Sequence, residues 1–394
     1  MRAAGIICEY NPFHLGHEKQ LRLVRERVGE DTAAVCLMSG NFVQRGAPAV
    51  FDKTVRARAA VECGASLVLE LPVTAALSSA EGFARGGVEI LDRLGAVDTL
   101  CFGSETGDTD ALVRAAEAMC SPEFTQALRT ALDEGRSYPV ARQLALERVS
   151  GDGALLTAPN DILAAEYCKA LLERGSRMLP LAVRRDGGYH DEAPDAENPS
   201  ATAVRAQLEQ GGTWRQLVPQ TAAAVYADAA RYSMRAGERA VLARLRGLTR
   251  EEWARVPFGS EGLWSKVWRA VQTEASVEAI LCAAKSKRYP RTRLQRLLLC
   301  AYLGIDAQTL LREAPYVRVL AFDEKGRALL REMRRNGALP IVNAGERGPD
   351  AEYFALECRC AALYGLFSEN PAETNGVPEE KIRIFQRKNA ICQE

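Results

Sequence analysis

The residues from Ala3 to His17 read AAGIICEYNPFHLGH, and this stretch gives the clearest indication of the fold. The apolar run Ala3–Cys8 has the length of a buried β-strand. An Asn-Pro pair follows as a turn signal, and a helical pattern begins close to His17. A strand that leads through a tight turn into a helix is the first half of a β-α-β unit, so we expect a parallel sheet at the beginning of the chain.

The same alternation of short apolar runs and helical stretches continues through the first half of the chain. The predicted strands are Ala3–Cys8, Ala33–Met38, Ser66–Leu71, Val97–Phe102 and Met178–Val183. The predicted crossover helices lie near His17–Val28, Lys53–Cys63, Ala80–Leu94 and Asp161–Glu173. Crossovers of this length join parallel strands and place helices on both faces of the sheet. The predicted fold class is therefore α/β, with a Rossmann-like parallel sheet.

Two segments depart from this alternation. Residues 106–158 are alanine-rich, polar and helical in pattern, which predicts a helical insertion between two strands. All four tryptophans lie at residue 214 or beyond, where helical periodicity dominates. We expect residues 1–214 to form the first domain and residues 215–394 a mainly helical second domain, with a small αβ element near Val317–Ile341.

Composition excludes several classes of protein. The 394 residues carry 51 Lys and Arg against 51 Asp and Glu, so any nucleic acid must be bound at a local basic patch. With 47% hydrophobic residues the chain can bury a core. No apolar run approaches the roughly 20 residues of a membrane helix, so we expect a cytoplasmic protein with no membrane partner. The eleven cysteines never form a C-x-x-C pair, which predicts reduced core residues.

Two of the three histidines, His14 and His17, follow the first predicted strand as H-x-G-H. At a helix start they lie beside free backbone N–H groups, where a phosphate chain can bind. Gly16 permits close approach of the backbone, and the imidazoles can stabilise charge that develops on attacked phosphates. The pattern predicts adenylyl transfer with both histidines catalytic. The alternatives are two ordinary polar residues, or a metal site, which Gly16 and the lack of a nearby third ligand disfavour.

A second group of phosphate-binding candidates follows the fifth predicted strand. Arg184 and Arg185 precede a glycine pair, and paired arginines suit a loop that binds phosphate or carboxylate. Residues 199–205 read PSATAVR and enter a helix, so the hydroxyl groups of Ser200 and Thr202 predict a second contact with a triphosphate. Taken alone, Ser200 is better explained as a helix N-cap.

Two further stretches suggest polar contacts. Met38–Pro48 is expected at the same sheet edge, with Arg45 a candidate for binding phosphate or tRNA, although polar surface loops also have this composition. Residues 285–296 carry six positive and no negative side chains, a density that suits an RNA footprint. Most short charge runs are solvated helix faces instead. The candidate tRNA contacts are Lys285, Lys287, Arg288, Arg291, Arg293 and Arg296.

The ordered motifs resemble one family, the bacterial tRNA(Met) cytidine acetate ligases. The stretches that carry the resemblance are GIICEYNPFHLGH (5–17), MSGNFVQRGAPA (38–49), GASLVLELP (64–72), FGSE (102–105), PNDIL (159–163), YHD (189–191) and KSKRYPRTRLQR (285–296). H-x-G-H alone is shared by many nucleotidylyltransferases, whereas this ordered set spans nearly the whole chain. The resemblance implies a nucleotidyltransferase-like, ATP-binding catalytic domain over 1–214 and a tRNA-binding helical domain over 215–394.

The resemblance also implies ATP-binding roles at matching positions. These positions are Ile7, Cys8, Glu9, Tyr10, Asn11, Pro12, Phe13, His14, Leu15, Gly16, His17, Glu18, Lys19, Gln20, Gly103, Asn160 and Arg185. The loop from Arg185 to Tyr189 is a residue shorter than the family pattern, which leaves Arg184 and Arg185 as alternatives for one contact. Ser200-Ala-Thr202 varies the usual S-A-S and keeps both hydroxyl groups.

The activity implied by the resemblance is that of a ligase. It would use ATP to convert acetate into acetyl-adenylate and then acetylate N4 of the wobble cytidine of elongator tRNA(Met), forming N4-acetylcytidine. Mg²⁺ is expected with the triphosphate. One alternative is a nucleotidylyltransferase that adenylylates a phosphorylated metabolite, which leaves the basic C-terminal half without a role. Another is a non-catalytic tRNA- or ribosome-binding protein, against which the intact H-x-G-H motif argues.

Overall fold

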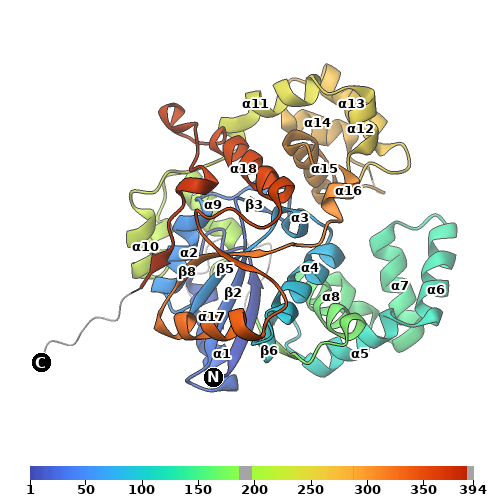
Figure 1. Cartoon of the computed structure of the whole chain (residues 1–394). Coiled ribbons are helices and arrows are strands. Elements are labelled where there is room, and N and C mark those ends of the chain that lie inside the picture. Colours follow the sequence, from blue (N-terminus) through green and yellow to red (C-terminus); the bar gives the residue numbers. More distant parts are fainter. Residues whose placement is uncertain (186–197, 287, 388–394) are drawn as a thin grey trace, which may run out of the picture.

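The computed structural model describes residues 1–185, 198–286 and 288–387, and these are built around one sheet (Figure 1). The order of its strands is β10-β8-β5-β2-β1-β6-β7, and β9 pairs with β8. The strands are β1 (Ala3–Cys8), β2 (Ala33–Ser39), β5 (Leu67–Leu71), β6 (Thr99–Ser104), β7 (Leu179–Arg184), β8 (Val317–Phe322), β9 (Ile341–Asn343) and β10 (Phe385–Gln386). Neighbouring strands run parallel, except that β5 and β8 are antiparallel.

The predicted α/β class is confirmed. The five predicted strands appear as β1, β2, β5, β6 and β7, with their ends displaced by at most two residues. The chain passes from β1 through β2 to β5 on one side and then returns to pair β6 with the other side of β1. The order of the strands therefore reverses at β1, and open parallel sheets bind their ligands outside the carboxyl ends of strands at such a point.

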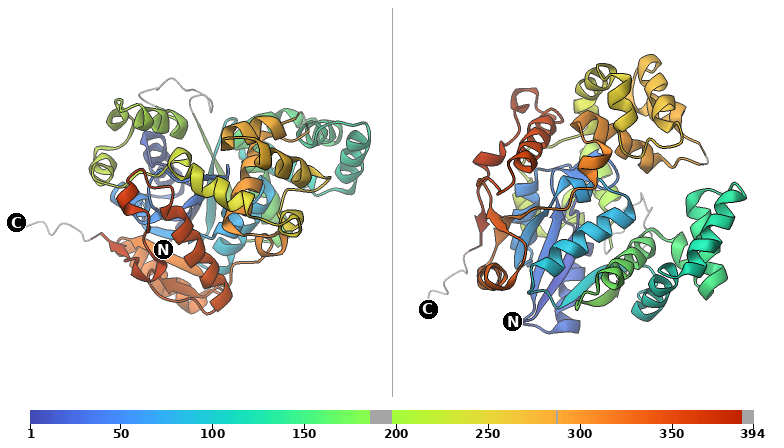
Figure 2. Two further views of the ribbon diagram at one scale, coloured as in Figure 1. Left: turned by 90° about the horizontal axis from the view of Figure 1, so that it is seen from above. Right: turned by 45° about the vertical axis from the view of Figure 1, so that its right-hand side comes forward.

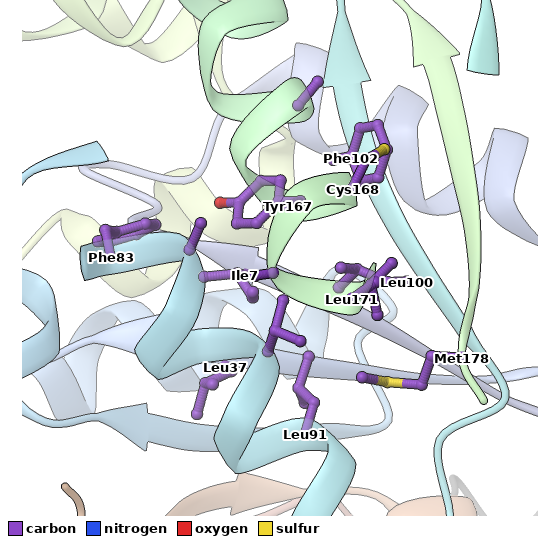
Figure 3. Packing of buried hydrophobic residues seen from close by; sticks show 14 of the residues in the cluster. Ile7, Leu37, Phe83, Leu91, Leu100, Phe102, Tyr167, Cys168, Leu171 and Met178 are labelled. Carbon is purple, nitrogen blue, oxygen red and sulfur yellow. The ribbon is translucent and has the colours of Figure 1, made fainter. Parts of the chain in front are cut away.

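Helices cover both faces of the sheet. One face packs against α4 (Ala80–Arg93), α5 (Thr109–Met119), α8 (Pro159–Arg174) and α17 (Glu324–Asn336). The other packs against α1 (Leu15–Val28), α2 (Lys53–Glu62), α9 (Ala201–Glu209) and α10 (Gln220–Tyr226). Figure 3 shows the core on the first face, where Ile7 of β1, Phe83 of α4 and Tyr167 of α8 come together. Residues 106–158, predicted as a helical insertion, contain α5, α6 (Pro122–Asp133), α7 (Tyr138–Ser150) and η1 (Gly153–Thr157).

A separate group of helices forms much of the C-terminal part (Figure 2). It contains α11 (Met234–Arg246), α12 (Arg250–Arg255), α13 (Leu263–Thr273), α14 (Val277–Ala284), α15 (Arg291–Leu303) and α18 (Ala351–Gly365), which share their own hydrophobic core. Shorter segments are η2 (Trp214–Leu217), α16 (Ala307–Leu310), η3 (Pro371–Glu373) and η4 (Glu379–Lys381). The predicted boundary at residues 214 and 215 does not follow the sheet, because β8, β9 and β10 complete it from beyond that point.

Two local structures lie between the sheet and this helical group. A hairpin of β3 (Phe42–Val43) and β4 (Ala47–Pro48) follows β2, and α3 (Val73–Ala76) follows β5. The sequence predicted only a functional loop over Met38–Pro48, because strands of two residues leave no periodic pattern. Phe42 packs in the core of the helical group, so the hairpin joins that group to the sheet.

A buried ionic cluster ties the last described residues to the sheet. Lys53 at the start of α2 donates to Glu70 of β5 at 2.8 Å and to Glu379 of η4. Arg318 of β8 donates to Glu357 of α18 at 2.8 Å. Burial raises the pKa of Glu379 to about 7, against the attraction of Lys53. Removing one partner from such a cluster is expected to cost about 3–5 kcal/mol, because an uncompensated buried charge remains.

The described residues also bear on membrane helices, cysteines and metal-binding clusters. No helix among them is long and apolar enough to cross a membrane. Their cysteines are all free, but the predicted core position is wrong for Cys120 and Cys282, which are exposed. No group of three or more His, Cys, Asp or Glu side chains in this part of the chain could hold a metal ion.

Candidate active site

The carboxyl ends of β1, β6 and β7 open into a cavity of about 420 Å³. It lies where the order of the strands reverses. The predicted site residues that line it are Ile7, Cys8, Glu9, Tyr10, Asn11, His14, Gly16, His17, Lys19, Gln20, Arg45, Gly103, Asn160, Arg185, Ser200 and Thr202. Residues from the beginning and the middle of the chain thus meet around one space.

The two histidines of the H-x-G-H motif are locked into the start of α1. His14 is the N-cap, and its Nδ1 accepts a hydrogen bond from the N–H of Gly16 at 3.1 Å. His17 Nδ1 accepts from the N–H of His14 at 3.3 Å, and the two rings stack with centroids 3.7 Å apart. A neutral imidazole whose Nδ1 accepts a hydrogen bond carries its proton on Nε2. Each ring therefore has an Nε2–H donor on the edge away from the helix backbone.

Both imidazoles are neutral at pH 7. Burial lowers the pKa of His14 to about 3, and the positive charges of Arg185 and Arg205 add to this effect. Burial also lowers the pKa of His17 well below its usual value, with further contributions from His14 and Arg185. The pair can therefore offer hydrogen-bond donors without carrying charge, and the positive charge in the cavity comes from arginines and Lys19.

A buried arginine that the sequence analysis missed holds the loop before α1. Arg56 of α2 is fully buried and donates to four backbone carbonyls, among them those of Glu9 at 2.6 Å and Ser39 at 3.1 Å. The side-chain oxygen of Asn11 accepts from the N–H of Val50 at 2.8 Å. An arginine within a helix gives no sequence signal of burial, because arginine is mostly exposed in proteins.

The FGSE and PND motifs bind each other across the cavity edge. The carboxylate of Glu105 accepts from the N–H of Asp161 at 2.8 Å and from the side-chain amide of Asn160 at 2.7 Å. In return, Asp161 accepts from the N–H of Glu105 at 3.0 Å. Asn160 also accepts from Arg185 at 3.2 Å. A Cβ at Gly103 would lie 2.9 Å from Cδ of Arg185, so glycine leaves room for that side chain.

The next segment contributes hydroxyl groups and a further arginine. Ser200 is the N-cap of α9, and its Oγ accepts a backbone N–H of the first turn at 3.0 Å, which is the alternative that the sequence favoured for it alone. Thr202 accepts from Arg205 at 3.2 Å, and Arg205 donates to the carbonyl of Asn11 at 2.7 Å. Arg184 lines the cavity but is exposed. The YHD motif at residues 189–191 lies outside the described residues.

The hairpin of β3 and β4 forms another wall. Glu9 accepts from the N–H of Gln44 at 2.7 Å, and burial raises the pKa of Glu9 although this hydrogen bond and nearby arginines oppose the shift. Arg45 lines the cavity on this hairpin. Gly46 has a φ of +78°, and a Cβ there would lie 2.5 Å from the backbone nitrogen of Arg296. Glycine thus lets the hairpin pack directly against α15.

Four residues of the implied ATP-binding stretch do not line the cavity, namely Pro12, Phe13, Leu15 and Glu18. Phe13 is fully buried, and its N–H donates to the hydroxyl of Tyr226 at 3.1 Å. Glu18 is exposed on α1. Successive residues of a turn and a helix point in different directions, so these four lie away from the cavity while the other residues of Ile7–Gln20 line it.

Two exposed arginines of the basic segment are paired with acidic residues from other parts of the chain. Arg288 forms an ion pair with Glu261 at 2.8 Å, and Arg291 donates to Glu278 at 2.7 Å. Lys285 is exposed, and Lys287 lies outside the described residues.

The last two arginines of the segment take part in packing. Arg293 donates to the carbonyl of Phe258 at 3.0 Å. Arg296 lies over the ring of Phe258, 5.1 Å from its centroid, and donates to the carbonyl of Gln44 at 3.3 Å. Burial lowers the pKa of Arg296 to about 10. Arg296 therefore joins α15 to the hairpin, and this differs from the solvent-exposed footprint expected from composition.

Several cavity residues escaped the sequence analysis. Phe83 of α4, Phe102 of β6 and Tyr167 of α8 form an apolar wall. Tyr232 and Glu369 add a wall from the C-terminal part. Aromatic residues in regular elements are most often core residues, so no pattern distinguished these from the rest of the core.

A parallel sheet whose first strand leads into H-x-G-H at a helix start, with arginines at the same edge, defines a nucleotidyltransferase-type site. The model of the HIGH Nucleotidyl Transferase family matches residues 1–378. The tRNA(Met) cytidine acetate ligase of Syntrophotalea carbinolica is 40% identical, with 87% of this chain and 84% of that protein covered. The protein of the same name from Clostridium novyi is 35% identical, with 86% and 89% covered.

Solved structures agree with these relatives. The crystal structure of Thermotoga maritima TmcAL bound with alpha-thio ATP has a TM-score of 0.88 and 29% identity, covering 98% of this chain and 100% of that chain. The apo form has a TM-score of 0.91 and 30% identity over the same shares. The chain belongs to the tRNA(Met) cytidine acetate ligase family of HIGH nucleotidyl transferases.

Proposed function

We propose that this chain is an ATP-dependent ligase that activates acetate as acetyl-adenylate and transfers the acetyl group to N4 of the wobble cytidine of elongator tRNA(Met). Its relatives are named for this activity, and they match most of the chain. The similar Thermotoga structure holds an ATP analogue. In this chain, the observation that carries the proposal is the stacked pair of His14 and His17 at the reversal of the sheet. These relatives do not favour the alternative of a metabolite nucleotidylyltransferase.

In the first step, a carboxylate oxygen of acetate attacks the α-phosphorus of ATP. A P–O bond forms to acetate while the bond to the departing pyrophosphate breaks, and the pyrophosphate keeps the electron pair. The Nε2–H groups of His14 and His17 donate to phosphate oxygens on which negative charge increases. Donors fixed before the reaction stabilise such charge without reorganisation. No nucleophile of the protein is needed, so catalysis consists of positioning and charge stabilisation.

The arginines and the neighbouring amides hold ATP in this proposal. Arg185, rather than Arg184, makes the charged contact with the phosphates of ATP. Its guanidinium is held by a hydrogen bond to Asn160, and it lies close enough to both histidines to lower their pKa. Gly103 offers its backbone beside them. Lys19 donates to Asn198 at 3.1 Å at the same edge, so its ammonium group also lies near the bound phosphates.

Mg²⁺ accompanies ATP in this proposal. Magnesium usually keeps several waters and is held through substrate phosphates and one or two carboxylates. The described residues fit this mode, since they contain no dedicated cage of acidic side chains. Glu9 and Glu209 are the carboxylates of the cavity wall that lie within residues 1–214 and could approach a nucleotide-bound ion. The ion would neutralise charge on the triphosphate.

In the second step, the N4 amine of cytidine attacks the acyl carbon. A C–N bond forms, the bond between that carbon and the phosphate oxygen breaks, AMP leaves, and the amine gives up a proton. We assign ATP to residues 1–214 and tRNA phosphates to the exposed side chains of the helical part beyond residue 215, including Lys285, Arg288 and Arg291. Arg45 lies at the cavity and is placed to contact a phosphate of either substrate. A tRNA substrate implies that the protein acts in the cytoplasm.

Pyrophosphate release tests the proposed function. The purified protein is incubated with ATP and Mg²⁺, with or without acetate, and then with elongator tRNA(Met) transcript. We expect release that requires acetate, followed by formation of N4-acetylcytidine only when tRNA is present. Release that requires a phosphorylated metabolite instead of acetate would support the alternative enzyme. A protein that binds tRNA but releases no pyrophosphate under any of these conditions would be a binding protein.

A further inference from the structure

The cavity wall contains a hydroxyl group without a hydrogen-bond partner. Tyr167 lies on α8 and lines the cavity, and only 3% of its surface is exposed. Its hydroxyl oxygen is buried and has no partner among the described residues. The other buried side-chain atoms without partners in this part of the chain belong to residues that do not line the cavity. Buried polar groups are nearly always hydrogen-bonded, so an exception at a ligand site points to a ligand atom.

The surroundings of this hydroxyl are apolar. Phe102 of β6 packs against Tyr167 with ring centroids 5.6 Å apart. Ile7 of β1 and Phe83 of α4 belong to the same core, and Figure 3 shows the hydroxyl of Tyr167 extending from α8 toward the side on which Phe83 lies. Ile7 cannot retreat, because a Cβ at Gly87 of α4 would already lie 2.6 Å from its Cδ1 atom. One buried polar group therefore lies among closely packed apolar side chains in the wall of the cavity.

This part of the cavity wall adjoins the loop that carries the histidines. Ile7 is followed directly by Cys8 and Glu9, which lead into the H-x-G-H turn, and all of them line the cavity. Burial raises the pKa of Tyr167 well above its usual value, with smaller contributions from Cys8 and Glu9, so the hydroxyl stays protonated and able to donate. A group bound here lies beside the place where we propose that the histidines hold the phosphates.

We propose that Tyr167 binds the carboxylate of acetate, its hydroxyl donating to one oxygen, while Ile7, Phe83 and Phe102 enclose the methyl group. This assignment rests on the proposed function and names the acid-binding part of the same cavity. The second carboxylate oxygen is left to attack the α-phosphorus. The walls limit the length of the acid, since a methylene group beyond the methyl would have to displace a packed side chain.

The Tyr167→Phe variant tests the assignment through substrate binding and stability together. It removes a donor to a charged acceptor, so KM for acetate should rise about tenfold or more in acetate-dependent pyrophosphate release. The Kd for ATP should not change. The unfolding temperature of the free protein should be unchanged or higher, because the lost hydroxyl has no partner in the fold.

Tyr302→Phe is the matched control. The Tyr302 hydroxyl donates to the carbonyl of Leu363 at 3.1 Å in the helical group, and Tyr302 does not line the cavity. Its removal should lower the unfolding temperature and leave KM for acetate unchanged. The opposite pattern in the two tyrosines distinguishes a ligand contact from a contact within the fold.

A second variant tests the apolar walls. Phe83→Leu shortens a side chain of this part of the wall, so the ratio of kcat/KM for propionate to that for acetate should rise about tenfold. An unchanged ratio would overturn the role of Phe83 in enclosing the methyl group.

Three outcomes separate this assignment from the proposed function. An unchanged KM for acetate in Tyr167→Phe, with an active wild-type protein, overturns the assignment alone. A weakened Kd for ATP in this variant overturns it too, because the hydroxyl would then serve the nucleotide. A wild-type protein that releases no pyrophosphate with acetate overturns the proposed function itself, and the acid-binding role falls with it.

Discussion

The H-x-G-H loop and the basic segment 285–296 both stand out in the sequence, but they differ in where their partners come from. The histidines are fixed by backbone groups of the same turn, with hydrogen bonds from Gly16 and His14, and their Nε2 edges remain available. In the basic segment, Arg288 and Arg291 are paired with Glu261 of the turn before α13 and with Glu278 of α14. The H-x-G-H loop is therefore preformed by its own backbone. In residues 285–296, acidic side chains from elsewhere in the fold offset much of the positive charge that the sequence shows.

The largest effect is expected from the first region. If the imidazoles donate to the reacting phosphates, His14→Ala and His17→Ala should each lower acetate-dependent pyrophosphate release about 10²-fold or more. Their loss removes donors that strengthen in the transition state. Steady-state release of pyrophosphate measures the effect, and circular dichroism checks that α1 persists.

Arg22→Ala is the control on the same helix. Arg22 is exposed and forms an ion pair with Glu26 one turn away, so its loss should leave the rate unchanged. Near-normal rates in both histidine variants would remove the motif from the mechanism and with it the contrast between the two regions.

Arg184 and Arg185 are adjacent and can be compared directly within the same site. Arg185→Ala should weaken ATP binding by about 1.5–3 kcal/mol, because it removes a charge-assisted hydrogen bond. Arg184→Ala should have a smaller effect, because that side chain is exposed. Isothermal titration of both variants with ATP compares them. A larger loss at Arg184 would place the phosphate contact one residue earlier in the loop.

The second region is tested by charge reversal at its exposed arginines. Arg288→Glu with Arg291→Glu should reduce the slope of log Kobs for tRNA against log salt by about two units at most, since each phosphate contact releases less than one counterion. Adenylate formation should not change. Filter binding at several salt concentrations gives the slope.

An unchanged slope in this double variant would show that the ion pairs with Glu261 and Glu278 are purely structural. The tRNA contacts would then lie elsewhere, and Arg45→Ala would be the next variant to measure. Arg296→Glu is a poor probe of tRNA binding, because Arg296 packs between Phe258 and the hairpin and its reversal should destabilise the fold.

The smallest change is expected from pH. The pKa of His14 is lowered to about 3 and that of His17 is lowered well below its usual value, so neither ring should titrate near neutral pH. NMR of the imidazole C–H groups in His190→Gln leaves only these two rings to observe. Titration of either ring with a midpoint above pH 6 would contradict the neutral pair.

The same shifts fix the sign of the effect on stability. The folded protein holds both histidines neutral, whereas an unfolded chain protonates them with pKa values of about 6.5. Below this pH the unfolded state binds more protons. The free energy of unfolding should therefore fall as the pH decreases from about 6.5 toward 3.

Much of the fold could be predicted from the sequence, because each central strand is a short apolar run between helical stretches. Ala3–Cys8 is an example, with the same limits in the prediction and in β1. The small αβ element predicted near Val317–Ile341 appears as β8, α17 and β9, whereas β10 and the antiparallel pairing of β8 with β5 were not predicted. Pairing depends on contacts between segments distant in sequence, and strands of two or three residues carry no period.

The site likewise contains residues that could be predicted from the sequence and residues that could not. His14 and His17 could be found because their role follows from a strand, a turn and a helix start that are contiguous. Arg56 could not be predicted, because its role depends on hydrogen bonds to backbone carbonyls that only the folded chain brings next to it. Tyr167 could not be found either, because only the folded structure shows that its hydroxyl has no partner.

Transfer of isotopically labelled acetate tests the central claim most directly. The protein, ATP, labelled acetate and elongator tRNA(Met) transcript are incubated together, and the nucleosides are analysed by mass spectrometry. The account predicts labelled N4-acetylcytidine at the wobble position, with AMP and pyrophosphate formed in equal amounts, and loss of the label in the His14→Ala, His17→Ala double variant. Labelling that persists without ATP, or in a folded double variant, would contradict it.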